Sequence, residues 1–348
     1  MRQKQLAILI GLTTTITGFQ FCSKKSSSAD TDVVAISVLN LPSTPYNYNV
    51  SFPQHIAQAL QQTDNTPANN AITDAGATLG RVLFYDKSLS INNTVACASC
   101  HKQESGFTDA AVKSLGFVGG QTARHSMNTL NVRFYASGKM FWDERAATLE
   151  NQVLQPIQND VEMGMTLPAL VTKLSAKSYY PDLFKSAFGT TEVTTDRISK
   201  ALAQFVRSIV TYQAKYDRVK QGQESFTAQE AQGEQLFLTA GGPGAACGGC
   251  HRPPMFTTSN PAGPFALQDP ADHGINNQNR FKSGSLRNIA AAVSLFHNGS
   301  VPNVTAMLAS NIPTHGVPPP NRAPLLAFLQ TLTDASVTTD VKFSDPFR

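Results

Sequence analysis

This sequence has little charge and little strand-like patterning. Charged residues make up only 15% of its 348 residues, the formal net charge is +4, and no run of Lys or Arg occurs away from the N-terminus. Nothing therefore points to a nucleic-acid partner. Strict alternation of apolar and polar residues is scarce, which favours helices over sheets. Hydrophobic residues reach 41%, so the chain is globular and long enough for one large or two medium cores.

Long apolar runs are also missing. The one uncharged stretch near the N-terminus, "LAILIGLTTTITGF", is too short and too rich in Thr to span a membrane. Because Arg2 and Lys4 precede it, residues 1–22 are predicted to be an export signal. Cys22 opens "CSKKSSS", so the signal either ends at a lipid-modified Cys22 or is cleaved a few residues later. The expected location is the periplasm, free or lipid-anchored, with residues 23–50 as a polar tether.

Cysteine is scarce, and its placement is informative. Four of the five cysteines lie in two five-residue motifs, "CASCH" at 97–101 and "CGGCH" at 247–251. Paired cysteines of this kind can hold zinc, form a redox dithiol or form disulfides. A His directly after the second Cys, twice in one exported chain, instead indicates c-type haem attachment.

The spacing explains why this chemistry needs these residues. On a helix the two cysteines and the histidine fall at i, i+3 and i+4, hence on one face. Two thiols can then add to the two vinyl groups of one porphyrin while the imidazole reaches the iron. The sequence therefore predicts two covalent haem c groups with His101 and His251 as proximal iron ligands, and the attached cysteines are Cys97, Cys100, Cys247 and Cys250.

Two motifs suggest two related domains. "GRVLF" (80–84) precedes the first motif as "GEQLF" (233–237) precedes the second, and "ALAQFVRSIVT" resembles "LLAFLQTLTD" near the end of each half. Apolar residues recur at helical spacing in the first of these closing segments, at Ile198, Leu202, Phe205 and Ile209. The predicted fold is mainly α: two cytochrome c-like helical haem domains related by duplication, with long loops, at 51–215 and 216–348.

A family resemblance rests on several motifs together. "LGRVLFYDKSLS", "CASCH", "FWDERAATLENQVLQPIQNDVEM", "CGGCH" and "FHNG" resemble bacterial dihaem cytochrome c peroxidases and their relative MauG, over roughly residues 75–335. The resemblance implies that hydrogen peroxide meets the N-terminal haem. It also implies that electrons enter at the C-terminal haem from a small redox protein, a cytochrome c or a cupredoxin, and it allows a homodimer.

The resemblance also assigns roles between the two haems. Trp142, the only tryptophan, stands where the family places an electron relay, although a lone Trp is often simply core. Gln152 and Glu162 match the pocket above the peroxide-binding iron. A carboxylate there can move a proton from one peroxide oxygen to the other, which typically accelerates such steps by about 10²–10⁴-fold. The alternative for Glu162 is a solvated loop charge.

Several positions depart from the family pattern. Many members carry a removable histidine ligand sixteen residues after the first proximal histidine, and this chain has Phe117 there. His125, beside Arg124, replaces an Asn that helps the family to bind calcium together with carbonyls that correspond here to those near Ala292 and Ser294, so calcium is in doubt. For His125 the sequence leaves open iron ligation, or packing and haem contact.

The sixth ligand of the C-terminal haem is ambiguous. The family uses Met, which raises the reduction potential, and MauG uses Tyr. The stretch "NVTAMLASNIPTHGV" holds one Met and one His but no Tyr, so the sequence favours Met307, then His315, then no protein ligand. Met307 as ordinary helix core is the alternative.

Three functions follow from these residues. The leading one is a dihaem c-type peroxidase that reduces hydrogen peroxide to water. The alternatives are MauG-like, peroxide-dependent oxidation of a protein partner, and a dihaem electron carrier without enzymatic activity. Phe117 favours the MauG-like enzyme because it leaves the first iron open, whereas Met307 and the missing Tyr favour the peroxidase.

Overall fold

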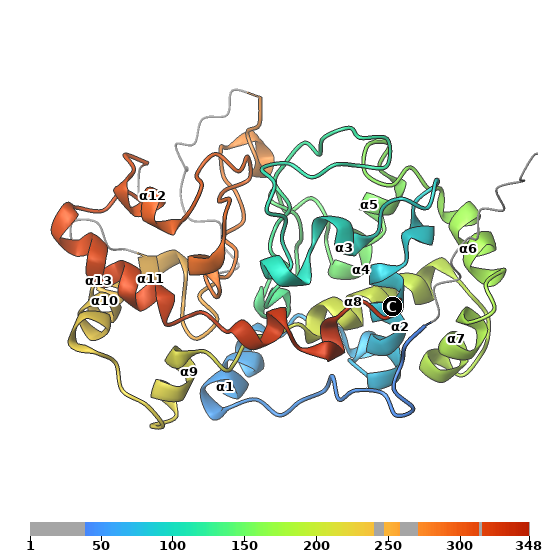
Figure 1. Ribbon diagram of the computed structural model, residues 1–348, viewed down its shortest axis with the longest axis horizontal. Coiled ribbons are helices and arrows are strands. Elements are labelled where there is room, and N and C mark those ends of the chain that lie inside the picture. The colour runs from blue at the N-terminus through green and yellow to red at the C-terminus, as the bar shows by residue number, and fades with distance from the viewer. Residues whose placement is uncertain (1–38, 240–246, 258–270, 313–314, 348) are drawn as a thin grey trace, which may run out of the picture. The chain divides into compact units, whose positions relative to one another are not determined.

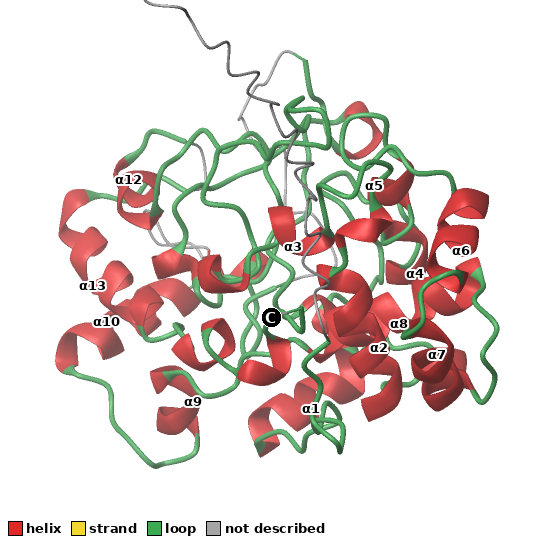
Figure 2. Cartoon of the chain, turned by 45° about the vertical axis from the view of Figure 1, so that its right-hand side comes forward, coloured by secondary structure: helices red, strands yellow, loops and turns green. Residues whose placement is uncertain are grey.

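The computed structural model describes residues 39–239, 247–257, 271–312 and 315–347, and these fold mainly into short helices joined by long loops (Figure 1). Within these ranges only isolated β-bridges occur, so the predicted helical class is confirmed (Figure 2). The helices are α1 (Gln54–Thr63), α2 (Asp74–Tyr85), α3 (Cys97–Cys100), α4 (Leu149–Gln152), α5 (Gln155–Gln158), α6 (Leu167–Ser175), α7 (Tyr180–Phe188), α8 (Thr195–Ser208), α9 (Lys215–Lys220), α10 (Ala228–Leu238), α11 (Cys247–Cys250), α12 (Val304–Ala309) and α13 (Pro319–Gln330).

Each half is built on a tightly crossed helix pair, α2 with α8 and α10 with α13. A glycine sits at each crossing. A Cβ on Gly80 would lie 2.0 Å from the carbonyl oxygen of Ala201, and a Cβ on Gly233 would lie 2.0 Å from that of Pro324. Only glycine permits this approach. The "G" shared by "GRVLF" and "GEQLF" is therefore a packing requirement repeated in both halves.

Helix α8 confirms the expected amphipathic segment. The side chain of Thr194 caps its start by accepting a hydrogen bond from the backbone N–H of Arg197 at 3.2 Å. The four apolar residues predicted to recur on one face are all fully buried: Ile198, Leu202, Phe205 and Ile209. Burial of this face against α2 forms the centre of the first core.

The duplication extends into the loops. Asn131 and Asn288 both adopt left-handed backbone conformations, with φ of 61° and 63°. The side-chain oxygen of Asn131 accepts a hydrogen bond from the backbone N–H of Thr211 at 3.0 Å, and that of Asn288 accepts one from Asp334 at 2.8 Å. Each asparagine thus ties the loop after its haem motif to the end of the long helix of the same half.

The two halves are not separate compact units, since all described residues belong to one. The C-terminal tail leaves its own half: Val337 and Phe343 are buried in the first core, beside α2 and α8. Arg81 of α2 donates from Nε to the carbonyl oxygen of Ser344 at 2.6 Å. The predicted boundary at 215/216 separates the helix pairs but not the tail.

The N-terminal lead-in is shorter than predicted. Tyr48 is only 2% exposed, and its backbone N–H donates to Asp74 Oδ1 at 2.8 Å, so the last part of the expected tether packs on the core. Residues 1–38, with the expected export signal and Cys22, lie outside the described residues. Among the helices that are described, none has the length and apolar character needed to cross a bilayer.

Candidate active site

Both Cys-x-x-Cys-His motifs adopt the geometry that their spacing predicts. Each pair of cysteines lies on one short helical turn, α3 or α11, and each histidine follows directly. His101 Nδ1 lies 3.2 Å from the carbonyl oxygen of Phe107, and His251 Nδ1 lies 3.2 Å from that of Phe256. A carbonyl can only accept, so Nδ1 carries the proton and Nε2 keeps its lone pair.

Burial keeps both imidazoles neutral. It is the main cause that lowers the pKa of His101, and the neighbouring His125 adds to the effect. Burial and then the nearby His315 lower the pKa of His251 to about 4. A neutral imidazole with a free Nε2 lone pair is the form that ligates iron.

The donor set fits two haem c groups. All four motif cysteines are free thiols, so no disulfide competes for them. In the described parts of the chain, no three His, Cys, Asp or Glu side chains gather as a metal-binding group, so the two motifs do not combine into a zinc site. Each motif can therefore hold its own haem through two thioether bonds and one imidazole.

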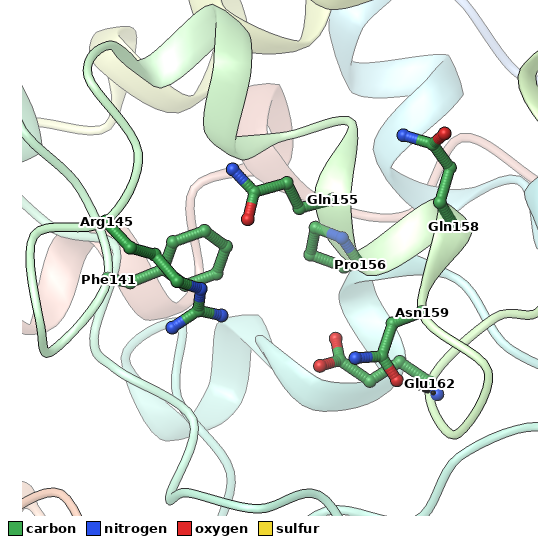
Figure 3. Close-up of a pocket in the computed structure, with 7 residues that line it drawn as sticks. All are labelled: Phe141, Arg145, Gln155, Pro156, Gln158, Asn159 and Glu162. Atoms are coloured by element: carbon green, nitrogen blue, oxygen red, sulfur yellow. Dashed lines mark hydrogen bonds between the residues drawn. The ribbon is translucent and has the colours of Figure 1, made fainter.

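A pocket in the first half lies between α5, the loop that follows it and the loop that precedes α4. It encloses about 330 Å³ and is lined by Phe141, Arg145, Gln155, Pro156, Gln158, Asn159 and Glu162. Figure 3 shows the carboxylate of Glu162, the guanidinium of Arg145 and the amide of Gln155 directed into this space. Arg145 also stacks on Phe141, with its guanidinium carbon 3.6 Å from the ring centroid.

Glu162 is not a solvated loop charge. Its side chain is half-buried, and burial raises its pKa, although Arg145 acts in the opposite direction. Its negative charge also contributes to raising the pKa of both Cys97 and Cys100, after burial and nearer charges. Glu162 therefore lies near the first haem motif, and its role above the iron stays a prediction. Arg145 was missed by sequence reasoning, although it stands within "FWDER".

The predicted amide partner differs in detail. Gln152 is the last residue of α4 and does not line the pocket, whereas Gln155 does. The chain continues in helical conformation from one to the other through Val153 and Leu154. Gln155 thus lies on the same helical face as Gln152, three residues further on. Gln152 itself stays a prediction.

Phe117 borders the same region and carries no ligating atom. Its backbone N–H donates to the carbonyl oxygen of Glu162 at 3.1 Å, and its side chain packs against the first core. A Cβ on Gly164 would come within 2.7 Å of the Phe117 ring, so the glycine makes room for it. The segment around Phe117 is thus held against the loop of Glu162.

Trp142 connects the two halves. Its Nε1–H donates to the carbonyl oxygen of His125 at 2.8 Å, and its own carbonyl accepts from the backbone N–H of Lys282 at 2.8 Å. The indole is half-buried rather than part of a core cluster. This position suits a relay, whose function stays a prediction.

His125 is engaged by the protein itself. It is 5% exposed, with Nδ1 at 3.1 Å from the carbonyl oxygen of Val112 and Nε2 at 3.3 Å from Thr108 Oγ1. Thr108 directly follows Phe107, the partner of His101, so His125 lies on the proximal side of the first motif. These contacts favour the packing role over iron ligation. The imidazole also supplies no further ligand to the calcium site that the sequence left in doubt.

Arg124, beside it, joins the halves. Its Nε and Nη2 donate to the Asp272 carboxylate at 2.6 and 2.7 Å, and Nη1 lies 2.8 Å from Asp143 Oδ2. Asp143 extends this ion network to Arg145, whose Nη1 lies 2.9 Å from Asp143 Oδ1. The network was not visible in the sequence because Asp272 is distant along the chain.

Both candidates for the sixth ligand lie in the C-terminal half. Met307, on α12, is partly buried against the second core cluster, which Cys247 also contacts. His315 meets the Phe296 ring edge-on at 5.2 Å and is close enough to influence the pKa of His251. The choice between them stays a prediction.

Comparison with known proteins agrees with this site. The family model described as di-haem cytochrome c peroxidase matches residues 74–225. The cytochrome c551 peroxidase of Nitrosomonas europaea is 32% identical over 74% of this chain and 79% of its own length. The chain belongs to the dihaem cytochrome c peroxidase and MauG family.

Other relatives lie on both branches of the dihaem peroxidase and MauG family. The methylamine utilization protein MauG of Methylophilus methylotrophus is 31% identical over 77% of this chain and 81% of its own. A crystal structure of a MauG-like protein associated with microbial copper homeostasis superposes with a TM-score of 0.73, at 28% identity, covering 87% of this chain and all of that one. Family membership implies two haem c groups, and both attachment motifs are present here.

Proposed function

We propose that this protein reduces hydrogen peroxide to water, using electrons that a small redox protein delivers at the C-terminal haem. When bound, the haems supply the iron chemistry that accepts peroxide and transfers single electrons. The observation that carries the proposal is the pocket of Glu162 and Arg145 near the first motif, together with Trp142 bridging the halves.

Glu162 performs the proton transfer in this scheme. Its carboxylate takes the proton from one peroxide oxygen and returns it to the other, which leaves as water. Burial raises its pKa, which makes it a better base than an ordinary exposed carboxylate and an acid able to return the proton. Arg145 donates hydrogen bonds that orient the peroxide, and Gln155 supplies an amide to the same space. Two electrons and two further protons complete the reduction to two waters.

MauG-like oxidation of a protein partner is the second candidate. It is favoured by Phe117, which offers the first iron no ligand and therefore no need for an activating electron. It is also favoured by the similarity to MauG of Methylophilus methylotrophus.

A first experiment measures peroxide consumption by the holoprotein with reduced cytochrome c, with and without prior reduction of the enzyme. Since Phe117 cannot close the first iron, we expect turnover without prior reduction and a high-spin ferric electron paramagnetic resonance signal from one haem of the resting protein. Mass spectrometry should show two covalent haem additions. Absence of peroxide consumption, or a single haem addition, would contradict the proposal.

A second outcome would revise the role of His125. Two low-spin haems in the resting protein, with one becoming high-spin only in His125→Ala, would mean that this imidazole reaches the iron despite its contacts with Val112 and Thr108.

We further propose that the protein works in the periplasm, because c-type haem attachment in bacteria occurs outside the cytoplasm and residues 1–22 have the pattern of an export signal. Lipid labelling of the wild type and of Cys22→Ser separates the anchored from the free form.

A further inference from the structure

A buried polar cluster lies directly beside Trp142. Tyr135 is 1% exposed, and its hydroxyl donates a hydrogen bond to Glu144 Oε1. Lys282 is 5% exposed, and its Nζ lies 3.8 Å from the centroid of the Tyr135 ring. The backbone N–H of the same lysine donates to the carbonyl oxygen of Trp142. Lys282 thus connects the phenol to the predicted relay, and Glu144 is two residues from the indole.

The tyrosine is held in its protonated form. Burial, and then the carboxylate of Glu144, raise the pKa of Tyr135 far above its usual range. A free phenolate is therefore not available to give up an electron. Oxidation becomes easier only if the hydroxyl proton leaves together with the electron, and Glu144 is already bonded to that proton.

The duplication provides an internal comparison. Two backbone hydrogen bonds between the halves are equivalent: His125 N–H donates to the His297 carbonyl, as Lys282 N–H donates to the Trp142 carbonyl. The matching asparagines Asn131 and Asn288 align Tyr135 with Ala292. The matching hydrogen bonds align Lys282 with His125 and Trp142 with His297, and therefore Glu144 with Gly299. The cluster exists on the Trp142 side alone.

Glu144 also replaces a residue better suited to its backbone. Its φ is 55°, in the left-handed region, where the equivalent Gly299 has a φ of 66°. This left-handed backbone conformation is disfavoured for any residue that has a Cβ. The carboxylate at this position accepts the hydrogen bond of the Tyr135 hydroxyl.

We propose that Tyr135 is a second redox-active residue on the relay, with Glu144 as its proton acceptor. In the step, one electron leaves Tyr135 for one of the two oxidising equivalents that peroxide provides, by way of Trp142. The O–H bond of Tyr135 breaks, its proton forms a new O–H bond on Glu144, and a neutral tyrosyl radical remains. An electron from the redox partner and the returning proton restore the pair. This inference rests on the proposed reaction with peroxide.

The test uses the holoprotein, rapidly mixed with hydrogen peroxide and frozen for electron paramagnetic resonance, with haem absorbance followed in parallel. We expect a tyrosyl signal that narrows when the protein is made with ring-deuterated tyrosine. Tyr135→Phe should abolish it. Glu144→Gln, which keeps an acceptor oxygen but holds a proton poorly, should lower its yield several-fold. Tyr48→Phe is the matched control, because Tyr48 is equally buried and donates to a backbone carbonyl, that of Lys342 at 2.7 Å.

The outcomes separate the two proposals. If haem absorbance does not respond to peroxide, the proposed function fails and this inference fails with it. If absorbance responds but no tyrosyl signal forms, or if the signal survives in Tyr135→Phe, the inference alone is overturned. An unchanged yield in Glu144→Gln would overturn the role of the carboxylate. Unaltered haem spectra in both variants would show that the haem sites are intact.

Discussion

The two loops that follow the haem motifs are built alike but carry different chemistry. Each makes a tight turn closed by a β-bridge, Met140 with Ala146 in the first half and Leu295 with Val301 in the second. Within these turns the first half presents Trp142, and the second presents His297. His297 stacks on Phe281 with ring centroids 3.7 Å apart, whereas the Trp142 indole donates to the carbonyl oxygen of His125 in its own half.

The difference shows where duplication has been kept and where it has been modified. Backbone features are shared: the glycine crossings, the left-handed asparagines and the carbonyl that holds each proximal histidine. Trp142, Tyr135 and Glu144 in the first half correspond to different residues in the second: His297, Ala292 and Gly299. The two halves thus offer similar backbone frames to their haem motifs but surround them with different side chains.

The largest effect is expected in the proposed proton-transfer pocket of the first half. Glu162→Gln should lower kcat for peroxide by about 10²–10⁴-fold, because the amide cannot accept a proton. In the wild type, activity should fall as the pH drops through the raised pKa of Glu162, since the protonated carboxyl is no longer a base. Steady-state kinetics against pH measures both. Asp160→Asn, an exposed change two residues away, is the control and should be neutral.

The glycine crossings test whether the halves share their packing. Gly80→Ala and Gly233→Ala each push a methyl group into a backbone carbonyl, at 2.0 Å in both cases. Each should cost about 3 kcal/mol of unfolding free energy, the upper end for overpacking, because backbone cannot move aside. Gly249→Ala, with open space around it, should cost far less. Thermal unfolding measures the difference, and a mild effect at only one crossing would show that the halves differ in packing.

The relay is tested at equivalent positions. Trp142→Phe should keep both haems yet slow electron passage between them by about tenfold or more, which corresponds to at least about 1.4 kcal/mol in the barrier. His297→Phe changes the matching residue and should have a much smaller effect. Stopped-flow absorbance of the two haems measures the transfer. Equal rates in both variants would assign Trp142 a packing role only.

The last effect concerns the buried lysine and is confined to the pH profile of stability. Burial lowers the pKa of Lys282 to about 7, although Glu144 acts against this. Between about pH 7 and the ordinary lysine pKa, the unfolded chain binds more protons than the folded one, so this group makes stability rise with pH. The slope is at most about 1.4 kcal/mol per pH unit. Lys282→Met should flatten this part of the stability profile, whereas His125→Gln, at the equivalent position, should not.

Sequence reasoning succeeded where the signal is local. The haem motifs, the helix around Phe205 and the loop position of Glu162 all follow from short-range spacing. It was less complete where contacts are distant in the chain. Arg124 and Asp272 form an ion pair although 148 positions separate them in the sequence. Lys282 and Tyr135 are in contact at a similar sequence separation, so no short stretch of sequence contains either pair.

Two smaller differences concern the pocket and the domain bounds. Gln155 lines the pocket and Gln152 does not, although α4 leads directly into α5, and the role of Gln152 over the first iron stays a prediction. The bounds of the tether and of the domains were predicted from composition. Composition carries no information on long-range packing, such as the burial of Tyr48 and Phe343 in the same core. Their rings lie 6.3 Å apart although almost 300 residues separate them.

The burial of the C-terminal tail in the first core makes one half of the molecule depend on residues that follow the other. Val337 and Phe343 are buried beside α2 and α8, and Arg81 of α2 donates to the carbonyl oxygen of Ser344 at 2.6 Å. Helix α3, which carries Cys97 and Cys100, contacts α2. A chain cut before Val337 would therefore keep every residue of the first half and still leave the core beneath the first haem motif incompletely packed.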